Sequence, residues 1–180
     1  MVTTARGLVL DHFQWINGHA DVWAIFRDPE ALAAVVRGLV EPFRDEQITA
    51  ICGIESRGFL LGAAAAVELG VGFVPVRKGD GLFPGAKVTR RTDPDYRSLR
   101  HTLRLQRPSL GPGDRVLLVD DWIETGSQAL AVKAMIEECR ASWAGCSVIV
   151  DQLGEKTKHH LGTVSALLPA RELPPYAPSA

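Results

Sequence analysis

The chain has 180 residues, 46% of them hydrophobic, a length and composition that suit one domain with a sizeable core. Its 20 basic and 21 acidic residues leave a formal net charge of -1, which indicates neither a nucleic-acid partner nor a membrane surface. No apolar stretch is long enough to cross a bilayer and the three cysteines lack metal-ligand spacing, so we expect a cytoplasmic protein with buried, reduced thiols.

Strand and helix patterns alternate along the chain. Residues 1–26 mix aromatic and polar side chains without a regular period, so we expect an irregular segment that covers the domain. Asp28 as N-cap and Pro29 at the first helical position predict a helix whose apolar residues recur at helical spacing. The later patterns predict strands over 48–54, 73–77, 116–120, 146–151 and 164–168, and helices over 59–69 and 128–140. Residues 155–161 are expected to form a short polar helix or a turn. This alternation indicates an α/β fold with a mostly parallel central sheet and helices on both faces.

The strongest chemical signal is the connection between the strand at 116–120 and the helix that begins at Gln128. In an open α/β sheet, ligands bind at the carboxyl ends of the strands. Consecutive backbone N–H groups, short hydroxyl side chains and the positive end of the helix dipole together favour a phosphate group there. The sequence therefore predicts a phosphate cup formed by Thr125, Gly126, Ser127 and Gln128.

Two carboxylates, Asp120 and Asp121, precede the phosphate cup and are called the acidic pair below. Carboxylates at a strand end can accept hydrogen bonds from a vicinal diol or hold a magnesium ion through its waters. A sugar phosphate with free hydroxyls satisfies the acidic pair and the cup together. The P-loop pattern G-x-x-x-x-G-K-[ST] is absent and no G-x-G-x-x-G follows a strand, which excludes both of these classes of phosphate site.

Cations gather after the predicted strand at 73–77. Arg77 and Lys78 stand at its carboxyl end, and residues 79–107, called the basic loop below, carry seven more lysines and arginines. Alternating apolar and polar residues over 99–106 predict one arm of a β-hairpin. Such a loop is either a solvated, disordered insertion or a mobile lid over a polyanion, and its position next to Arg77 and Lys78 favours the lid.

Two segments resemble the type I phosphoribosyltransferases, and among them most closely the adenine phosphoribosyltransferases. One is VLLVDDWIETG (116–126), a hydrophobic run, two acids, two apolar residues, a variable position and T-G; the other is GIESRGFLLGAAAAVELGVGFVPVRKGDGLFPG (53–85). The resemblance implies the type I phosphoribosyltransferase fold in a single domain over residues 1–172, with a hood at about 1–27 and the basic loop as a flexible β-hairpin. Residues 173–180 contain three prolines and are expected to form a disordered tail.

The resemblance also implies an activity, that of a glycosyltransferase of the pentosyltransferase class. Such an enzyme transfers the phosphoribosyl group of phosphoribosyl pyrophosphate (PRPP) to a purine base, with adenine expected first. It releases pyrophosphate and forms a nucleoside monophosphate in purine salvage. It uses Mg²⁺, which PRPP brings close to the acidic pair without direct ligation by the protein, and it forms a homodimer. Two alternatives stay open: a phosphoribosyltransferase for a 6-oxopurine or another heterocyclic base, and a non-catalytic PRPP-binding regulator of the same fold.

By the same resemblance, three groups of residues receive roles. The acidic pair and the phosphate cup, with Glu124, bind the ribose diol and its phosphate. A turn with a non-proline cis peptide between Glu55 and Ser56 holds the pyrophosphate, and the implied pyrophosphate contacts are Glu55, Ser56, Arg57, Lys78 and Tyr96. The implied acid/base candidates are Asp95, which stands where the family's loop has an acid followed by tyrosine, and Glu124.

Several positions depart from the family pattern, among them the shorter acid Asp95 in the loop and Gln128, which replaces the usual threonine of the cup. Arg97 replaces the glycine that follows tyrosine in the loop, and Ala20 replaces an arginine of the hood. Glu124 replaces the alanine before T-G and resembles the acid of 6-oxopurine enzymes. Because an anion inside the cup would repel phosphate, Glu124 either points toward the nucleobase, where it takes or shares a ring proton, or faces solvent near the helix N-terminus. These departures leave the identity of the base open.

Overall fold

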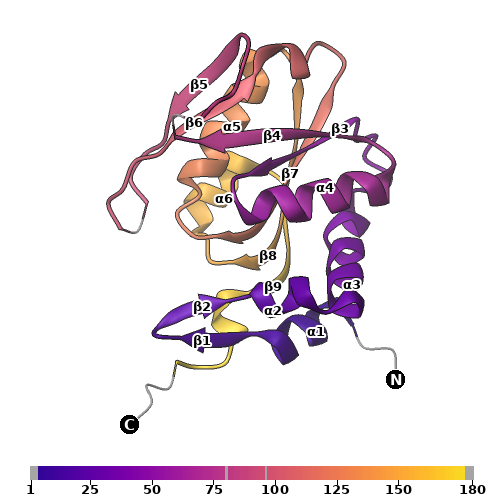
Figure 1. Ribbon diagram of the computed structural model, residues 1–180, viewed down its shortest axis with the longest axis vertical. Coiled ribbons are helices and arrows are strands. Elements are labelled where there is room, and N and C mark those ends of the chain that lie inside the picture. Colours follow the sequence, from indigo (N-terminus) through magenta and orange to yellow (C-terminus); the bar gives the residue numbers. More distant parts are fainter. Residues whose placement is uncertain (1–3, 80, 96, 177–180) are drawn as a thin grey trace.

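The computed structural model describes residues 4–79, 81–95 and 97–176. In this part of the chain, a seven-stranded sheet runs in the order β5-β6-β4-β3-β7-β8-β9 (Figure 1). Its strands are β3 (Ala50–Ile54), β4 (Gly72–Lys78), β5 (Lys87–Arg91), β6 (Thr102–Gln106), β7 (Arg115–Ile123), β8 (Ser142–Asp151) and β9 (Val164–Pro169). Neighbours from β4 to β9 run parallel, whereas β5 and β6 form an antiparallel hairpin that joins the sheet at β4. The predicted α/β fold with a mostly parallel sheet is confirmed.

Helices cover both faces of this sheet, as predicted. Alternate residues of β7 face opposite sides, so Leu117 lies in one apolar core with α3 and α4, and Leu118 lies in the other with α5 and α6. Burial on both faces explains why β7 reads as a continuous apolar run. The helices are α1 (Ala5–His12), α2 (Trp23–Arg27), α3 (Pro29–Val40), α4 (Arg57–Leu69), α5 (Ser127–Glu138) and α6 (Glu155–Leu161), with short 3₁₀ turns η1 (Glu41–Phe43), η2 (Arg107–Ser109) and η3 (Ala170–Glu172).

The ends of two helices follow the local sequence. Asp28 accepts a hydrogen bond from the Ala31 N–H at 2.7 Å, and Pro29 is the first residue of α3, as its capping pattern predicts. The structure also ends α4 at Gly70, whose backbone adopts φ 70°, a conformation that glycine accepts without steric cost. The start of α4 lies two residues earlier than predicted, at Arg57 rather than Phe59.

Strand β7 is longer than predicted. It continues beyond Asp120 to Ile123, and its register pairs Trp122 with Val150 and Ile123 with Asp151. The extension depends on backbone pairing with β8, which local pattern does not reveal. The acidic pair therefore lies within the last four residues of the strand rather than at its end.

The expectation of an irregular segment over residues 1–26 is wrong for the described part. Helix α1, the hairpin strands β1 (Gln14–Ile16) and β2 (His19–Asp21), and α2 fill it. These elements have three to eight residues, too few for a clear hydrophobic period. One local signal was present, because Asn17 and Gly18 join the strands with φ 50° and 79°, and Asn-Gly is the strongest short hairpin signal.

The C-terminal segment packs against this hairpin as far as the structure describes it. Leu173 is buried, and the Trp15 indole N–H donates to the Pro174 carbonyl at 2.8 Å. The Tyr176 ring meets the Trp15 ring edge-on, with 5.7 Å between their centroids. In Figure 1 the described part of this segment, in yellow, runs close to β1. Residues 173–176 of the expected disordered tail are therefore packed, while residues 177–180 lie outside the described residues.

The basic loop contains the β5–β6 hairpin, so the predicted hairpin arm is confirmed by β6. Val88, Leu103 and Leu105 of this hairpin are buried in the same core as α5.

None of the helices in the described part of the chain has the length and apolar character needed to span a bilayer. The cysteines are free and buried as expected, and burial raises the pKa of the Cys146 thiol to about 12.

Candidate active site

A cavity of about 910 Å³ opens at the carboxyl ends of β3, β4 and β7. Other parts of the chain reach it, among them the β1–β2 hairpin, the far end of the basic loop and the starts of α4 and α5. The predicted site residues that line it are Glu55, Ser56, Arg57, Lys78, Asp95, Asp120, Asp121, Glu124, Thr125, Gly126, Ser127 and Gln128. Tyr96 lies outside the described residues. The fold thus brings the predicted groups, far apart in sequence, to one cavity.

The phosphate cup occupies the turn between β7 and α5. Gly126 has φ 76°, and a Cβ there would lie 2.5 Å from Thr157 Cγ2, so only glycine fits the turn. The Thr125 hydroxyl donates to Ser127 Oγ at 3.1 Å and accepts from the Ser127 N–H at 3.3 Å. Helix α5 begins at Ser127, so the turn lies at the positive end of its dipole. This arrangement suits a phosphate group.

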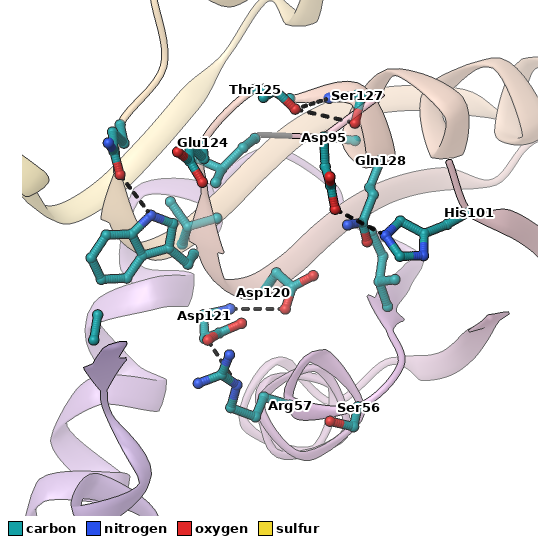
Figure 2. A pocket seen from close by; sticks show the side chains of 18 of the residues that line it. Ser56, Arg57, Asp95, His101, Asp120, Asp121, Glu124, Thr125, Ser127 and Gln128 are labelled. Carbon is teal, nitrogen blue, oxygen red and sulfur yellow. Dashed lines mark hydrogen bonds and ion pairs between the residues drawn. The ribbon is translucent and has the colours of Figure 1, made fainter. Parts of the chain in front are cut away.

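In Figure 2 the acidic pair lies between the phosphate cup and Arg57. Asp120 Oδ1 accepts the Asp121 N–H at 2.9 Å and would lie 2.9 Å from a Cβ on Gly58, so glycine lets α4 approach this carboxylate. Burial first, and then the charge of Asp121, raise the pKa of Asp120 well above its usual range. Two acids held this close need cations or hydroxyl donors, which a ligand can supply.

Arg57, in the first turn of α4, provides one such cation. Its Nε lies 2.9 Å from Asp121 Oδ2, an ion-pair distance, although this buried oxygen receives no hydrogen bond of good geometry from the described residues. The same guanidinium lies over the Trp23 ring, 5.5 Å from its centroid. Arg57 therefore links the acidic pair to α2 of the hood.

The peptide bond between Glu55 and Ser56 is cis, as the family resemblance implied. The Glu55 carboxylate accepts a hydrogen bond from the Lys78 N–H at 2.9 Å and forms an ion pair with Arg77 at 3.2 Å. Burial acts to raise the pKa of Glu55, but the hydrogen bonds from Arg77 and Lys78 prevail and lower it. These contacts hold the ends of β3 and β4 together at the cavity wall.

Glu124 stands between the acidic pair and the cup in the sequence, and its side chain lines the cavity. In Figure 2 its carboxyl lies to one side of the Thr125 and Ser127 hydroxyls rather than between them. Burial, followed by the negative charge of Asp95, raises the pKa of Glu124, while the charge of Arg97 acts in the opposite direction. The Glu124 carboxyl is thus close enough to the basic loop for its charges to act on it.

One end of the cavity is aromatic, and of the residues that form it the sequence had singled out only Ala20. Trp15 and Ala20 of the hood line it with Trp122 of β7, and all three pack against the core on that face. The Trp122 indole N–H donates to Gln152 Oε1 at 3.1 Å, which orients both side chains. An aromatic residue directly after the acidic pair was the available signal. Flat apolar walls with a few polar groups suit a heterocyclic ring.

Comparison with known proteins agrees with this geometry. The chain matches the phosphoribosyl transferase domain family over residues 22–167. It is 44% identical to the adenine phosphoribosyltransferase of Methylococcus capsulatus over 131 residues, which make up 73% of this chain and 75% of that protein. It is 40% identical to the adenine phosphoribosyltransferase of a Nocardioides species over 148 residues, 80% of this chain and 78% of the relative.

Solved structures give the same result. The adenine phosphoribosyltransferase of Rhodothermus marinus superposes with a TM-score of 0.81 at 30% identity, covering 92% of this chain and 98% of the other. The enzyme of Giardia lamblia, complexed with 9-deazaadenine, gives a TM-score of 0.82 at 30% identity over 92% and 97% of the two chains. The family resemblance found in the sequence is thereby confirmed. The chain belongs to the type I phosphoribosyltransferase family, in the group of the adenine phosphoribosyltransferases.

Proposed function

We propose that this chain is a purine phosphoribosyltransferase that transfers the phosphoribosyl group of PRPP to adenine and releases pyrophosphate. The observation that carries the proposal is the single cavity that joins a phosphate cup, two acids and two cations to an aromatic end. PRPP requires the charged groups and a purine ring requires the aromatic walls. Relatives named adenine phosphoribosyltransferase support adenine as the base.

The charged groups divide naturally between the parts of PRPP. The ribose phosphate binds the cup, and the ribose hydroxyls donate to the acidic pair. The pyrophosphate lies between the Glu55–Ser56 turn, Arg57 and Lys78. Arg57 then exchanges its ion pair with Asp121 for the pyrophosphate, which frees that carboxylate for the diol. In this assignment, Arg57 couples the two parts of the site: when it binds pyrophosphate, the Asp121 carboxylate becomes available to the ribose diol.

The proposed reaction breaks the bond between the anomeric carbon and pyrophosphate and forms a bond to a ring nitrogen of the base. Positive charge develops on the sugar, so water must be excluded, and the basic loop is suited to this because its far end lines the cavity. The attacking base loses a ring proton. Glu124 is the carboxyl proposed to receive or share it, since its raised pKa brings it closer to neutral pH.

The residues also fit a magnesium ion that PRPP carries. Asp121 Oδ2 is a buried carboxylate oxygen without a hydrogen bond from the described residues, and Asp120 lies beside it. Carboxylates and water are the ligands that Mg²⁺ prefers, so the acidic pair would hold the ion through its waters. When bound, Mg²⁺ neutralises charge on the departing pyrophosphate.

A homodimer in the cytoplasm is also part of the proposal. Leu60 and Val67 are 49% and 83% exposed on α4, and an apolar helix face of this kind suits a subunit interface. Three unpaired thiols suit a reducing compartment. Sedimentation equilibrium tests the dimer, and Val67→Glu should shift it toward monomer, whereas Thr89→Glu on the exposed side of β5 should not.

The deciding experiment measures pyrophosphate release from PRPP and Mg²⁺ with adenine, hypoxanthine, guanine, xanthine or orotate, alongside calorimetric PRPP binding. Adenine should give the highest kcat/KM. Preference for another base would overturn the substrate assignment, and PRPP binding without turnover on any base would overturn the enzyme assignment.

The diol assignment has its own test. Replacing both Asp120 and Asp121 by Asn should abolish calorimetric PRPP binding, because the hydroxyls lose their charged acceptors. Asp93→Asn is the control, since that side chain is 87% exposed in the basic loop. Full PRPP affinity in the double variant would remove the diol from the acidic pair.

A further inference from the structure

Asp95 has a different set of partners from the other acids of the cavity. We infer that Asp95 is a positioning residue that, with His101, holds the far end of the basic loop in shape, rather than the acid/base group of the reaction. The inference rests on the proposed function for its kinetic test. It reassigns a residue that the family resemblance implies to be catalytic.

One oxygen of the Asp95 carboxylate is occupied by the loop backbone. Oδ1 accepts the N–H of Arg97 at 2.9 Å and the N–H of Leu99 at 2.9 Å. Two backbone bonds close the same turn, from Asp95 N to Leu99 O at 2.8 Å and from Ser98 N to Asp95 O at 2.9 Å. The carboxylate therefore serves as an acceptor inside the turn that it begins.

The second oxygen is also occupied. Asp95 Oδ2 lies 3.1 Å from His101 Nε2, and the two side chains are 10% and 26% exposed. The position of His101 is also fixed, because its backbone N–H donates to the Thr92 hydroxyl at 2.9 Å and its backbone carbonyl accepts the Thr92 backbone N–H at 2.8 Å. Figure 2 shows Asp95 and His101 meeting at one side of the cavity. We call the contact between these two side chains the loop clasp.

A carboxylate with both oxygens bound in this way is poorly suited to carry a proton. The N–H of Leu99, together with the His101 ring and the Arg97 N–H, lowers the pKa of Asp95 although burial opposes the shift. Glu124 differs in both respects. It has no hydrogen bond or ion pair to another side chain among the described residues, and burial raises its pKa. Both acids line the cavity, and of the two Glu124 has the carboxyl that other side chains in the described part of the protein do not already engage.

The loop clasp has a clear structural purpose. Asp95, Arg97 and His101 all line the cavity. The charges of Asp95 and Arg97 already act on the Glu124 carboxyl, so the shape of this turn sets the field at that acid. Loss of the clasp would leave the turn with its backbone bonds and the Asp95 Oδ1 contacts but no tie to His101, and the lid would order less readily over PRPP.

The decisive comparison is between Asp95→Asn and Asp95→Ala. Asparagine keeps an oxygen for the two backbone N–H groups and offers an N–H to a neutral His101 ring, but it cannot carry a proton to the base. We expect D95N to retain kcat within about tenfold, and D95A to raise KM for PRPP by about tenfold or more. Equal losses of 100-fold or more in kcat for both variants would show that Asp95 is the acid/base group and overturn the inference.

His101 provides a second, independent arm. H101A should raise KM for PRPP in the same direction as D95A but by less, because it removes only the contact at Asp95 Oδ2 and leaves the two bonds at Oδ1. The double variant should be no worse than D95A alone, because D95A already removes the contact with His101. H101Q should recover much of the loss, since its amide can still donate to Asp95 Oδ2. Thr89→Ala, on an exposed side chain of the same hairpin, is the matched control and should leave both kinetic constants unchanged. Additive losses in D95A and H101A would contradict the clasp.

A readout without turnover separates this inference from the proposed function. Trypsin cleavage after Arg97 and Arg100 should be faster in D95A and H101A than in the wild type, D95N or T89A. If the wild type shows no phosphoribosyl transfer yet the cleavage order holds, the proposed function fails and the clasp stands. Identical cleavage rates in all five proteins would overturn the clasp whatever the activity.

Discussion

Asp120 is suited to binding a ligand, but its buried charge lowers the stability of the folded state. Its carboxyl lies beside that of Asp121, and burial and that neighbouring charge raise its pKa. Between the unfolded pKa, about 3.9, and the raised folded value, the folded state binds more protons than the unfolded state. The contribution of the Asp120 carboxyl to the free energy of unfolding is therefore fully present at low pH, and it is lost as the pH rises through this window.

We accordingly expect Asp120→Asn to stabilise the protein at pH 7, because asparagine keeps the acceptor for the Asp121 N–H without the charge. A gain of ~1 kcal/mol would raise Tm by roughly 2–4 °C in a chain of this size. Calorimetric Tm values between pH 4 and pH 8 should show a difference from wild type that grows with pH. Asp93→Asn, at an exposed position, should show none. A difference that stays constant with pH would refute the explanation.

Glu124 leads to a prediction about activity rather than stability. A proton acceptor must be ionised, and because burial raises the pKa of Glu124, the acidic limb of kcat/KM should lie above the ordinary carboxyl range of about 4.3. Glu124→Gln should remove that limb and lower kcat by roughly 100-fold. Rates between pH 4 and pH 8 with saturating PRPP provide the measurement. An acidic limb that persists in the variant would assign it to another group.

At the scale of elements, the turn from β7 to α5 determines whether the cup forms. Gly126→Ala should destabilise the protein by about 1–3 kcal/mol, because alanine resists positive φ and its Cβ would clash with Thr157. Urea unfolding measures the loss, and PRPP calorimetry should show weaker binding. Gly111→Ala is the matched control, since a Cβ there meets nothing within 4 Å. Equal stabilities for the two variants would contradict this account of the turn.

At the scale of the whole molecule, the hood and the C-terminal segment form one wall of the cavity. Trp15 lines the cavity and is held by Pro174 and by the Tyr176 ring. Deletion of residues 174–180 should raise KM for adenine by roughly tenfold, equivalent to ~1.4 kcal/mol, and leave the calorimetric affinity for PRPP unchanged. Deletion of 177–180 alone is the control. An equal loss of affinity for PRPP and for adenine would mean that the deletion damages the whole site.

Local sequence determined much of this protein by itself. The cap at Asp28, the stop at Gly70 and the cup at Gly126 each depend on residues within a few positions, so pattern is sufficient to locate them. The alternation of elements was also enough for the parallel sheet with helices on both faces, because each strand must bury its two apolar sides.

The features that depend on contacts between residues far apart in the sequence were visible only in the tertiary structure. Strand β7 extends to Ile123 because β8 lies beside it, and Trp15 is held by a segment that begins more than 150 residues later. The ion pair of Arg57 with Asp121 and the loop clasp join side chains whose sequence spacing carries no signal. Residue types therefore indicated the ligand, whereas the fold decided which acid is bound within the protein and which remains available to the substrate.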